Sequence, residues 1–186
     1  EPGLVTERAR VFGGWLVRQT PRSLLDNTPL HGLLERVLDF PALEAAIGRG
    51  DLRALSVTAS GYSSGESLAV FQGAPDEQSW RRAQRLGVRA ELDVCHVLAS
   101  AALPFVFPAV KIHREYFGDG SMRQLAPVSP AIHLGADRIL VIGAGRTAEE
   151  GRVRAAGGYP SPAQIAGHAL SSIFLDTLEV DLERLA

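Results

Sequence analysis

The chain has 186 residues, of which 46% are hydrophobic and 22% are charged, a composition typical of one globular domain that excludes a disordered chain. The 19 basic and 21 acidic residues give a net charge of −2, so no nucleic-acid-binding surface is predicted. Cys95 is the only cysteine, which excludes a disulfide framework and a cysteine-rich zinc site. Because no run approaches about 20 apolar residues, no membrane-spanning helix is predicted.

Residues 1–22 form a basic N-terminal segment in which arginines are interspersed with apolar side chains. This pattern is compatible with a helix that has one solvated face. The same arginines could contact an anionic membrane surface, although a solvated face is the commoner cause of such a pattern. The residues concerned are Arg8, Arg10, Arg18 and Arg22, with Phe12, Trp15, Leu16 and Val17 between them.

Two short helices are predicted next. Thr28 is the expected N-cap of the first, and Pro29 fits its first helical position, where the missing N–H removes no hydrogen bond. Asp39 or Phe40 is expected to cap the second helix, and Gly48 and Gly50 to end it. Apolar residues follow each start at helical spacing: Leu30, Leu33, Leu34, Val37 and Leu38, then Leu43, Ala46 and Ile47.

The pattern then changes to that of a β-hairpin over residues 52–72. A short apolar strand is predicted over 52–60, a turn rich in glycine and serine over 61–65, and a returning strand over 67–72. Residues 73–90 are polar and rich in arginine, and we expect them to be irregular.

A helix capped by Asp93 is predicted to follow and to end before Pro104. Alternation predicts one strand over Val110–Phe117, with the tight turn Gly118-Asp119-Gly120 at its end. Ser129-Pro130 is expected to cap another short helix, over Ala131–Leu134.

The last predicted strand is the nearly all-apolar segment Arg138–Ile142, which suits a sheet covered on both faces. A loop is expected over 146–160 and a long C-terminal helix over 161–186, with an apolar stripe of Leu170, Phe174, Leu178 and Leu182. Because strands alternate with helices, the sequence predicts an α/β layered fold.

Four stretches together resemble the patatin-like phospholipases, a family of lipid acyl hydrolases. They begin with SLLDNTPL at Ser23, LSVTAS at Leu55, HVLASAALP at His96 and YFGDGS at Tyr116, and the last continues through PVSPA to LGADRILVIG. Their order and spacing carry the resemblance, which covers about residues 23–185. It implies a three-layer α/β/α sandwich. We expect residues 1–186 to be a single partial domain, the C-terminal portion, which lacks the N-terminal strands and the nucleophile elbow.

The resemblance also implies hydrolysis of acyl esters by a Ser–Asp dyad, with Asp119 as its aspartate. The family's Asp-Gly-Gly or Asp-Gly-Ala turn matches Asp119-Gly120-Ser121, with Ser121 in the third place and Gly118 before it. A serine hydroxyl is a weak nucleophile, so a neighbouring base must take its proton. Without this context, Asp119-Gly120 would read as an ordinary turn.

The nucleophile is not evident. The family places a glycine-rich oxyanion loop and a Gly-x-Ser-x-Gly elbow before the four stretches, and residues 1–22 hold neither. Residues 61–65 match Gly-x-Ser-x-Gly, which makes Ser63 an alternative nucleophile. A working elbow leads from a strand into a helix, however, whereas a strand is predicted after Gly65. We therefore expect the serine to come from outside this stretch of sequence.

Other reactive side chains have simpler interpretations. Ser100 could be a hidden nucleophile, but close packing of a small-residue helix under the active site is favoured. Cys95 is interpreted as a buried small hydrophobe. No metal site is predicted, because the five histidines lack metal-ligand spacing: His31, His96, His113, His133 and His168. The resemblance to a Ser–Asp hydrolase implies no cofactor.

The leading hypothesis is a lipid acyl hydrolase, and the alternative is a non-catalytic truncated module that binds lipid or a partner protein. The expected partners are a lipid or ester substrate, a membrane surface contacted peripherally, and either a second copy of the chain or a complementing N-terminal fragment. We expect no nucleic acid, and a cytoplasmic or membrane-peripheral location. The open apolar sheet of a partial domain predicts that 1–186 is unstable alone.

Overall fold

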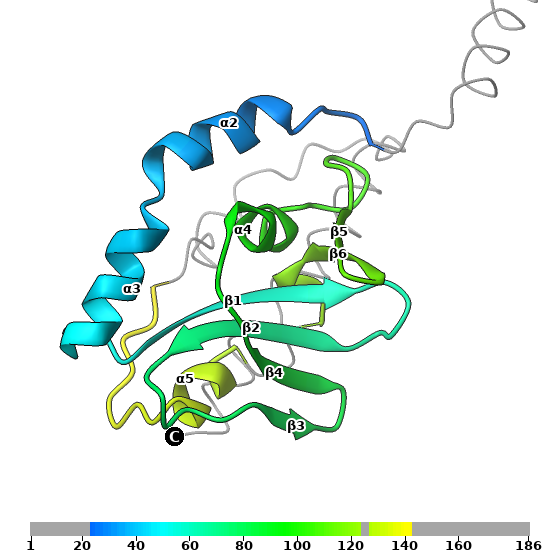
Figure 1. Ribbon diagram of the computed structural model, residues 1–186. Helices are drawn as coiled ribbons and strands as arrows, with labels where there is room; N and C mark the ends of the chain where they lie inside the picture. The colour runs from blue at the N-terminus through cyan, green and yellow to red at the C-terminus, as the bar shows by residue number, and fades with distance from the viewer. Residues whose placement is uncertain (1–22, 124–126, 143–186) are drawn as a thin grey trace, which may run out of the picture.

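The computed structural model describes residues 23–123 and 127–142, which form a mixed six-stranded sheet flanked by short helices (Figure 1). The strand order is β3-β4-β2-β1-β6-β5. The strands are β1 (Ala54–Gly61), β2 (Ser67–Gly73), β3 (Trp80–Arg82), β4 (Arg85–Arg89), β5 (Val110–Ile112) and β6 (Glu115–Asp119). The helices are α2 (Thr28–Val37), α3 (Phe40–Arg49), α4 (Val94–Ser100), α5 (Ser129–His133) and the 3-10 helix η1 (Gly120–Arg123).

The predicted hairpin is confirmed and forms the centre of the sheet. β1 and β2 pair antiparallel from Ala54 opposite Gly73 to Ser60 opposite Ser67. β2 also pairs parallel with β4, and β1 pairs antiparallel with β6 over its last three residues. The end of β6, and therefore Asp119, lies beside Ala59 of the central strand β1.

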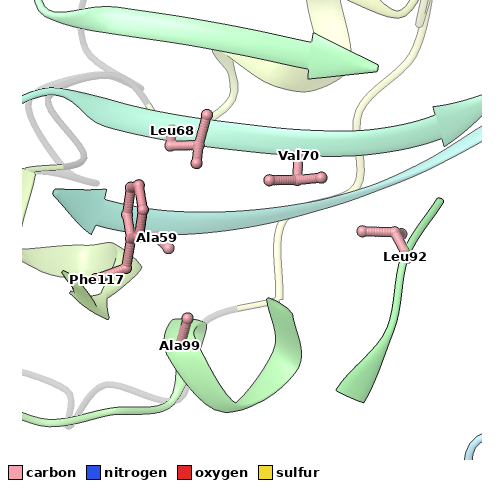
Figure 2. Packing of buried hydrophobic residues seen from close by; sticks show 6 residues of the cluster. All are labelled: Ala59, Leu68, Val70, Leu92, Ala99 and Phe117. Carbon is pink, nitrogen blue, oxygen red and sulfur yellow. The ribbon is translucent and has the colours of Figure 1, made fainter. Parts of the chain in front are cut away.

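One face of the sheet packs against α4. Alternate residues of paired strands share this face, and Ala99 of α4 is fully buried against them. Figure 2 shows the cluster of buried side chains, which is made by Ala59, Leu68, Val70, Leu92, Ala99 and Phe117. The alternation of side chains along each strand therefore places one set of residues against α4 and the other set on the opposite face of the sheet.

The opposite face is covered by α5. Phe71, which points away from α4, is completely buried and stacks on Trp80 of β3 with ring centroids 5.0 Å apart. Trp80 in turn stacks on His133 of α5, with centroids 4.9 Å apart. With α4 on one face and α5 on the other, the expected α/β/α arrangement of layers is present (Figure 1).

Several helix ends follow the predicted capping rules. Asp39 caps α3 by accepting a hydrogen bond from the Ala42 N–H, and Gly50 ends that helix with φ of 79°. Asp93 caps α4 in a reciprocal capping box with His96. The predicted cap at Thr28 is wrong by one residue, because Thr28 is already helical and follows the N-cap residue Asn27.

The prediction of an irregular segment over residues 73–90 is wrong, because β3 and β4 form a hairpin there. β4 gains backbone partners on both sides, from β3 and from β2. The Arg89 guanidinium donates to the carbonyl oxygens of Pro75, Glu77 and Gly73, which satisfies this charged group inside the turn. The arginines made this segment resemble a loop, but β4 forms because β2 pairs with it.

The single strand predicted over Val110–Phe117 is also wrong. The chain reverses at His113, where φ is 53°, and returns as β6, so the segment is a tight hairpin of β5 and β6. β6 continues beyond the predicted end to Asp119, because Ser60 and Ala59 of β1 pair with Gly118 and Asp119.

The predicted strand over Arg138–Ile142 has no regular structure. Leu140 and Ile142 are 86% and 88% exposed, and no described strand pairs with this segment. The segment is apolar enough for a strand but lacks a backbone partner here. The predicted basic segment 1–22, the loop 146–160 and the long helix 161–186 lie outside the described residues.

Candidate functional site

Asp119 is the last residue of β6, and three hydrogen bonds hold it in place. Its N–H donates to the carbonyl oxygen of Ala102, which follows α4, over 3.0 Å. Its carboxylate Oδ1 accepts hydrogen bonds from the N–H and the hydroxyl of Ser121, over 2.8 and 2.6 Å. No described residue donates to Oδ2, so one oxygen of this half-buried carboxylate stays available for another donor.

A groove of about 520 Å³ opens beside Asp119. One wall comes from β1, another from α4 and the residue after it, and the end from Asp119 and η1. The lining residues are Ser56, Val57, Thr58, Val97, Ser100, Ala101, Asp119, Gly120 and Ser121. The carboxylate therefore borders a space with both apolar and hydroxyl-bearing walls.

The two glycines that flank Asp119 allow close approach of two different neighbours. A Cβ on Gly118 would meet the ring and hydroxyl of Tyr62, a side chain that is about half exposed. A Cβ on Gly120 would overlap the backbone carbonyl of Thr58 in β1. At both positions, glycine is required because a larger residue would collide with a neighbour. That neighbour is a side chain at Gly118 and backbone at Gly120.

This difference predicts unequal effects of alanine at the two positions. Gly120→Ala should destabilise the protein by about 1–3 kcal/mol, because the β1 backbone cannot move away and the turn that carries Asp119 must shift. Gly118→Ala is the matched control and should cost less, since the Tyr62 side chain can rotate into solvent. The free energy of unfolding by urea measures both, and equal losses would contradict this account.

Tyr62 is the described side chain whose electrostatics most directly involve Asp119. The pKa of the Tyr62 hydroxyl is raised above its ordinary value, first by partial burial and then by the negative charge of Asp119. Tyr62 also donates its backbone N–H to the Tyr116 carbonyl over 3.0 Å, which ties the β1–β2 turn to β6. The phenol thus stays protonated beside the carboxylate at neutral pH.

Ser63 lies in the turn between β1 and β2 and is exposed. Its N–H and that of Ser64 donate to Glu115 Oε1 over 2.8 and 2.6 Å, and these bonds lower the Glu115 pKa. A strand, not a helix, follows the turn. No hydrogen bond joins Ser63 to Asp119, so the structure does not bring this pair together.

Ser100, the last residue of α4, is half-buried and lines the groove beside Asp119. The prediction that Cys95 is buried is wrong, since its side chain is exposed on α4. The pKa of its thiol is raised, mainly by partial burial and then by Asp93, which disfavours the reactive thiolate.

The other predicted groups have local roles. His96 completes the capping box of α4, and His133 stacks on Trp80. Among the described residues, no three histidine, cysteine or acidic side chains gather in an arrangement that could hold a metal ion. None of the described helices combines the length and apolarity needed to cross a membrane.

Sequence reasoning missed the neighbours that the fold gives to Asp119. Thr58 and Tyr62 come from segments 61 and 57 residues away in the chain, and no local pattern indicates that they lie close to Asp119. Only the small residues at 118 and 120 signalled that other groups approach closely.

Comparison with known proteins identifies one relationship. A family model described as patatin-like phospholipase matches residues 6–132 of this chain. No curated protein and no solved structure matches the chain significantly.

Proposed function

Since the chain belongs to the patatin-like phospholipase family, we propose that it takes part in the hydrolysis of lipid acyl esters, with Asp119 as the general base of a Ser–Asp dyad. The observation that supports this role is the position of Asp119 at the edge of a groove. One carboxylate oxygen is fixed by Ser121, and the other is free of donors from the described residues. A general base must be held so that one of its oxygens faces the proton that it takes from the nucleophile.

The proposed reaction has two steps. A serine Oγ attacks the ester carbonyl carbon and passes its proton to Asp119, which then returns it to the departing alcohol, leaving an acyl-serine. In the second step, Asp119 takes a proton from water, the hydroxide attacks the acyl carbon, and the serine recovers its proton as the acid is released. Backbone N–H groups are expected to stabilise the oxyanion.

We propose further that the nucleophilic serine is supplied by a segment outside residues 1–186. Ser63 is in a hairpin turn and does not bond to Asp119. Ser121 bonds to Asp119, but its N–H and hydroxyl share the same oxygen in a local turn two residues long, which is a common structural arrangement. Ser100 shares the groove without a hydrogen bond to the carboxylate.

A fluorophosphonate probe, which reacts with activated serines, tests this proposal through the mass of the intact protein. We expect no adduct on residues 1–186 alone and one adduct on the polypeptide that carries the additional segment. An adduct that maps to Ser63, Ser100 or Ser121 in the 186-residue chain would overturn the assignment. No adduct on either polypeptide, together with retained binding to phospholipid vesicles, would instead support a non-catalytic lipid-binding module.

A further inference from the structure

Four large apolar side chains are exposed together where the segment before α2 meets the loop after α4. Leu24 and Phe105 are 80% and 74% exposed, and Leu25 and Leu103 are exposed beside them in the sequence. The N–H groups of Leu24 and Leu25 donate to the carbonyl oxygens of Phe105 and Val106, both over 2.8 Å. These bonds join two segments that are distant in the chain. We call Leu24, Leu25, Leu103 and Phe105 the apolar patch.

The apolar patch is held in shape by its own backbone. The carbonyl oxygen of Leu103 accepts hydrogen bonds from the N–H groups of Val106 and Phe107, over 3.2 and 3.0 Å, which closes a tight turn. Phe105 lies inside this turn with φ of 66°, a left-handed conformation that bulky residues rarely adopt. An aromatic side chain that is held in water by an unfavourable backbone conformation supports a functional role for the turn.

The same loop joins the apolar patch to the groove beside Asp119. Ser100 and Ala101 line that groove, and the carbonyl oxygen of Ala102 accepts the Asp119 N–H over 3.0 Å. Phe105 is four residues beyond Ala101, which is at most about 14 Å of extended chain. A surface that contacts the apolar patch therefore lies close to the proposed general base.

The size and chemistry of the apolar patch fit a lipid surface better than a protein partner. A stable protein interface takes about 20–30 residues from each partner, whereas the apolar patch has four. The N–H groups of Leu24 and Leu25 are already bonded within it, so they cannot add a strand to a partner. The exposed side chains need no directional contacts, which suits burial in the interfacial region of a bilayer.

The charge of the two segments indicates which lipid surface fits. Residues 23–25 and 101–110 contain no charged side chain. Anionic bilayers attract clusters of lysine and arginine, and the apolar patch has none. Contact through apolar side chains alone therefore favours a zwitterionic surface, and salt, which screens charges, should not weaken it.

We propose that the apolar patch is the surface by which this protein inserts into a zwitterionic lipid bilayer, with the groove beside Asp119 held next to the same bilayer. The proposal rests on the lipid ester substrate proposed above. Insertion removes Leu24 and Phe105 from water, and the rigid turn keeps the bound lipid close to the loop that carries Ser100 and Ala101 into the groove.

Sedimentation with vesicles tests this contact on the polypeptide that carries the nucleophile. The vesicles consist of a diether phosphatidylcholine, which has no carboxylic ester to hydrolyse. The double variant Leu24→Ala/Phe105→Ala should lower the partition coefficient at least about tenfold, because two large side chains lose apolar area. Raising NaCl to about 0.5 M should leave binding of the unsubstituted protein unchanged.

The matched control is Leu33→Ala/Val37→Ala. Leu33 and Val37 are also exposed, at 47% and 67%, but they lie on α2, and Val37 is at the end of that helix remote from Leu24. This control should change the partition coefficient by less than about twofold, since it leaves the apolar patch intact. Urea midpoints equal to that of the unsubstituted protein verify that both double variants are folded.

A fluorescent label gives a second measurement that leaves the two largest exposed groups in place. In a Cys95→Ala background, Leu25→Cys carries an environment-sensitive dye while Leu24 and Phe105 remain. On addition of vesicles, the emission should shift to shorter wavelength and should be quenched by lipids with a spin label on the acyl chain. The same dye at Val37→Cys should show neither change.

Several results would overturn the proposal. Equal losses from the two double variants, or a dye at position 25 that stays in water, would show that the apolar patch does not insert. Binding that requires anionic lipid and is lost in salt would assign the contact to the basic residues of segment 1–22. A change of oligomeric state in Leu24→Ala/Phe105→Ala, with vesicle binding retained, would assign the apolar patch to a protein contact. Because the vesicles hold no carboxylic ester, none of these outcomes depends on whether Asp119 is a general base.

Discussion

Replacing Asp119 with asparagine is expected to lower the rate of ester hydrolysis by about 10²–10⁴-fold, the usual contribution of a general base. Asparagine has the same shape and can still accept the two hydrogen bonds from Ser121, so the turn should be retained. It cannot take a proton from the nucleophile at neutral pH. The initial rate of hydrolysis of a soluble ester, measured on the polypeptide that carries the nucleophile, gives the effect on kcat.

The matched control is Ser121→Ala. This change removes the hydroxyl bond to Oδ1 but keeps the backbone N–H bond, so the carboxylate remains oriented. We expect a loss of less than about tenfold, which corresponds to the net contribution of one hydrogen bond. A loss from Ser121→Ala as large as that from Asp119→Asn would contradict the proposed roles and would favour Ser121 as the nucleophile.

The second large effect concerns the face of the sheet opposite α4. Phe71→Ala should reduce the free energy of unfolding by about 3–5 kcal/mol, because it leaves a cavity under Trp80 at a site with no exposed surface. That is a substantial part of the 5–15 kcal/mol by which domains are typically stable, so the urea transition of the polypeptide that carries the nucleophile should shift clearly.

Phe105→Ala is the control for this measurement. The chemical change is the same, but Phe105 is 74% exposed, and surface substitutions usually alter stability by about 0.5 kcal/mol or less. Similar losses from the two variants would contradict the described packing of Phe71, Trp80 and His133. A larger loss from Phe105→Ala would place that side chain in contact with residues outside the described part of the chain.

The sequence predicted the elements whose signals are local. Asp39, Gly50 and Asp93 mark helix ends because capping bonds join residues only a few positions apart. The hairpin of β1 and β2 was predictable because alternation and a short turn specify it within about 20 residues. The turn that carries Asp119 was found in the same way, from adjacent glycines and a family resemblance that the family-model match supports.

The errors concern segments whose structure depends on distant partners. Arginines at residues 81–89 obscured β4, which exists because β2 and β3 pair with its two edges. The turn at His113 was missed because a non-glycine residue adopts a positive φ there. Conversely, Arg138–Ile142 has the composition of a strand, but composition alone supplies no neighbouring backbone to pair with.

By itself, the sequence determined the α/β class, the N-caps of α3 and α4 and the motif Asp119-Gly120-Ser121, because periodicity and capping act over a few residues. Only the tertiary structure decided that Asp119 borders a groove with Thr58, that Tyr62 lies against Gly118, and that Leu24 lies beside Phe105. These arrangements depend on strand order and on contacts between residues far apart in the chain, which no local pattern encodes.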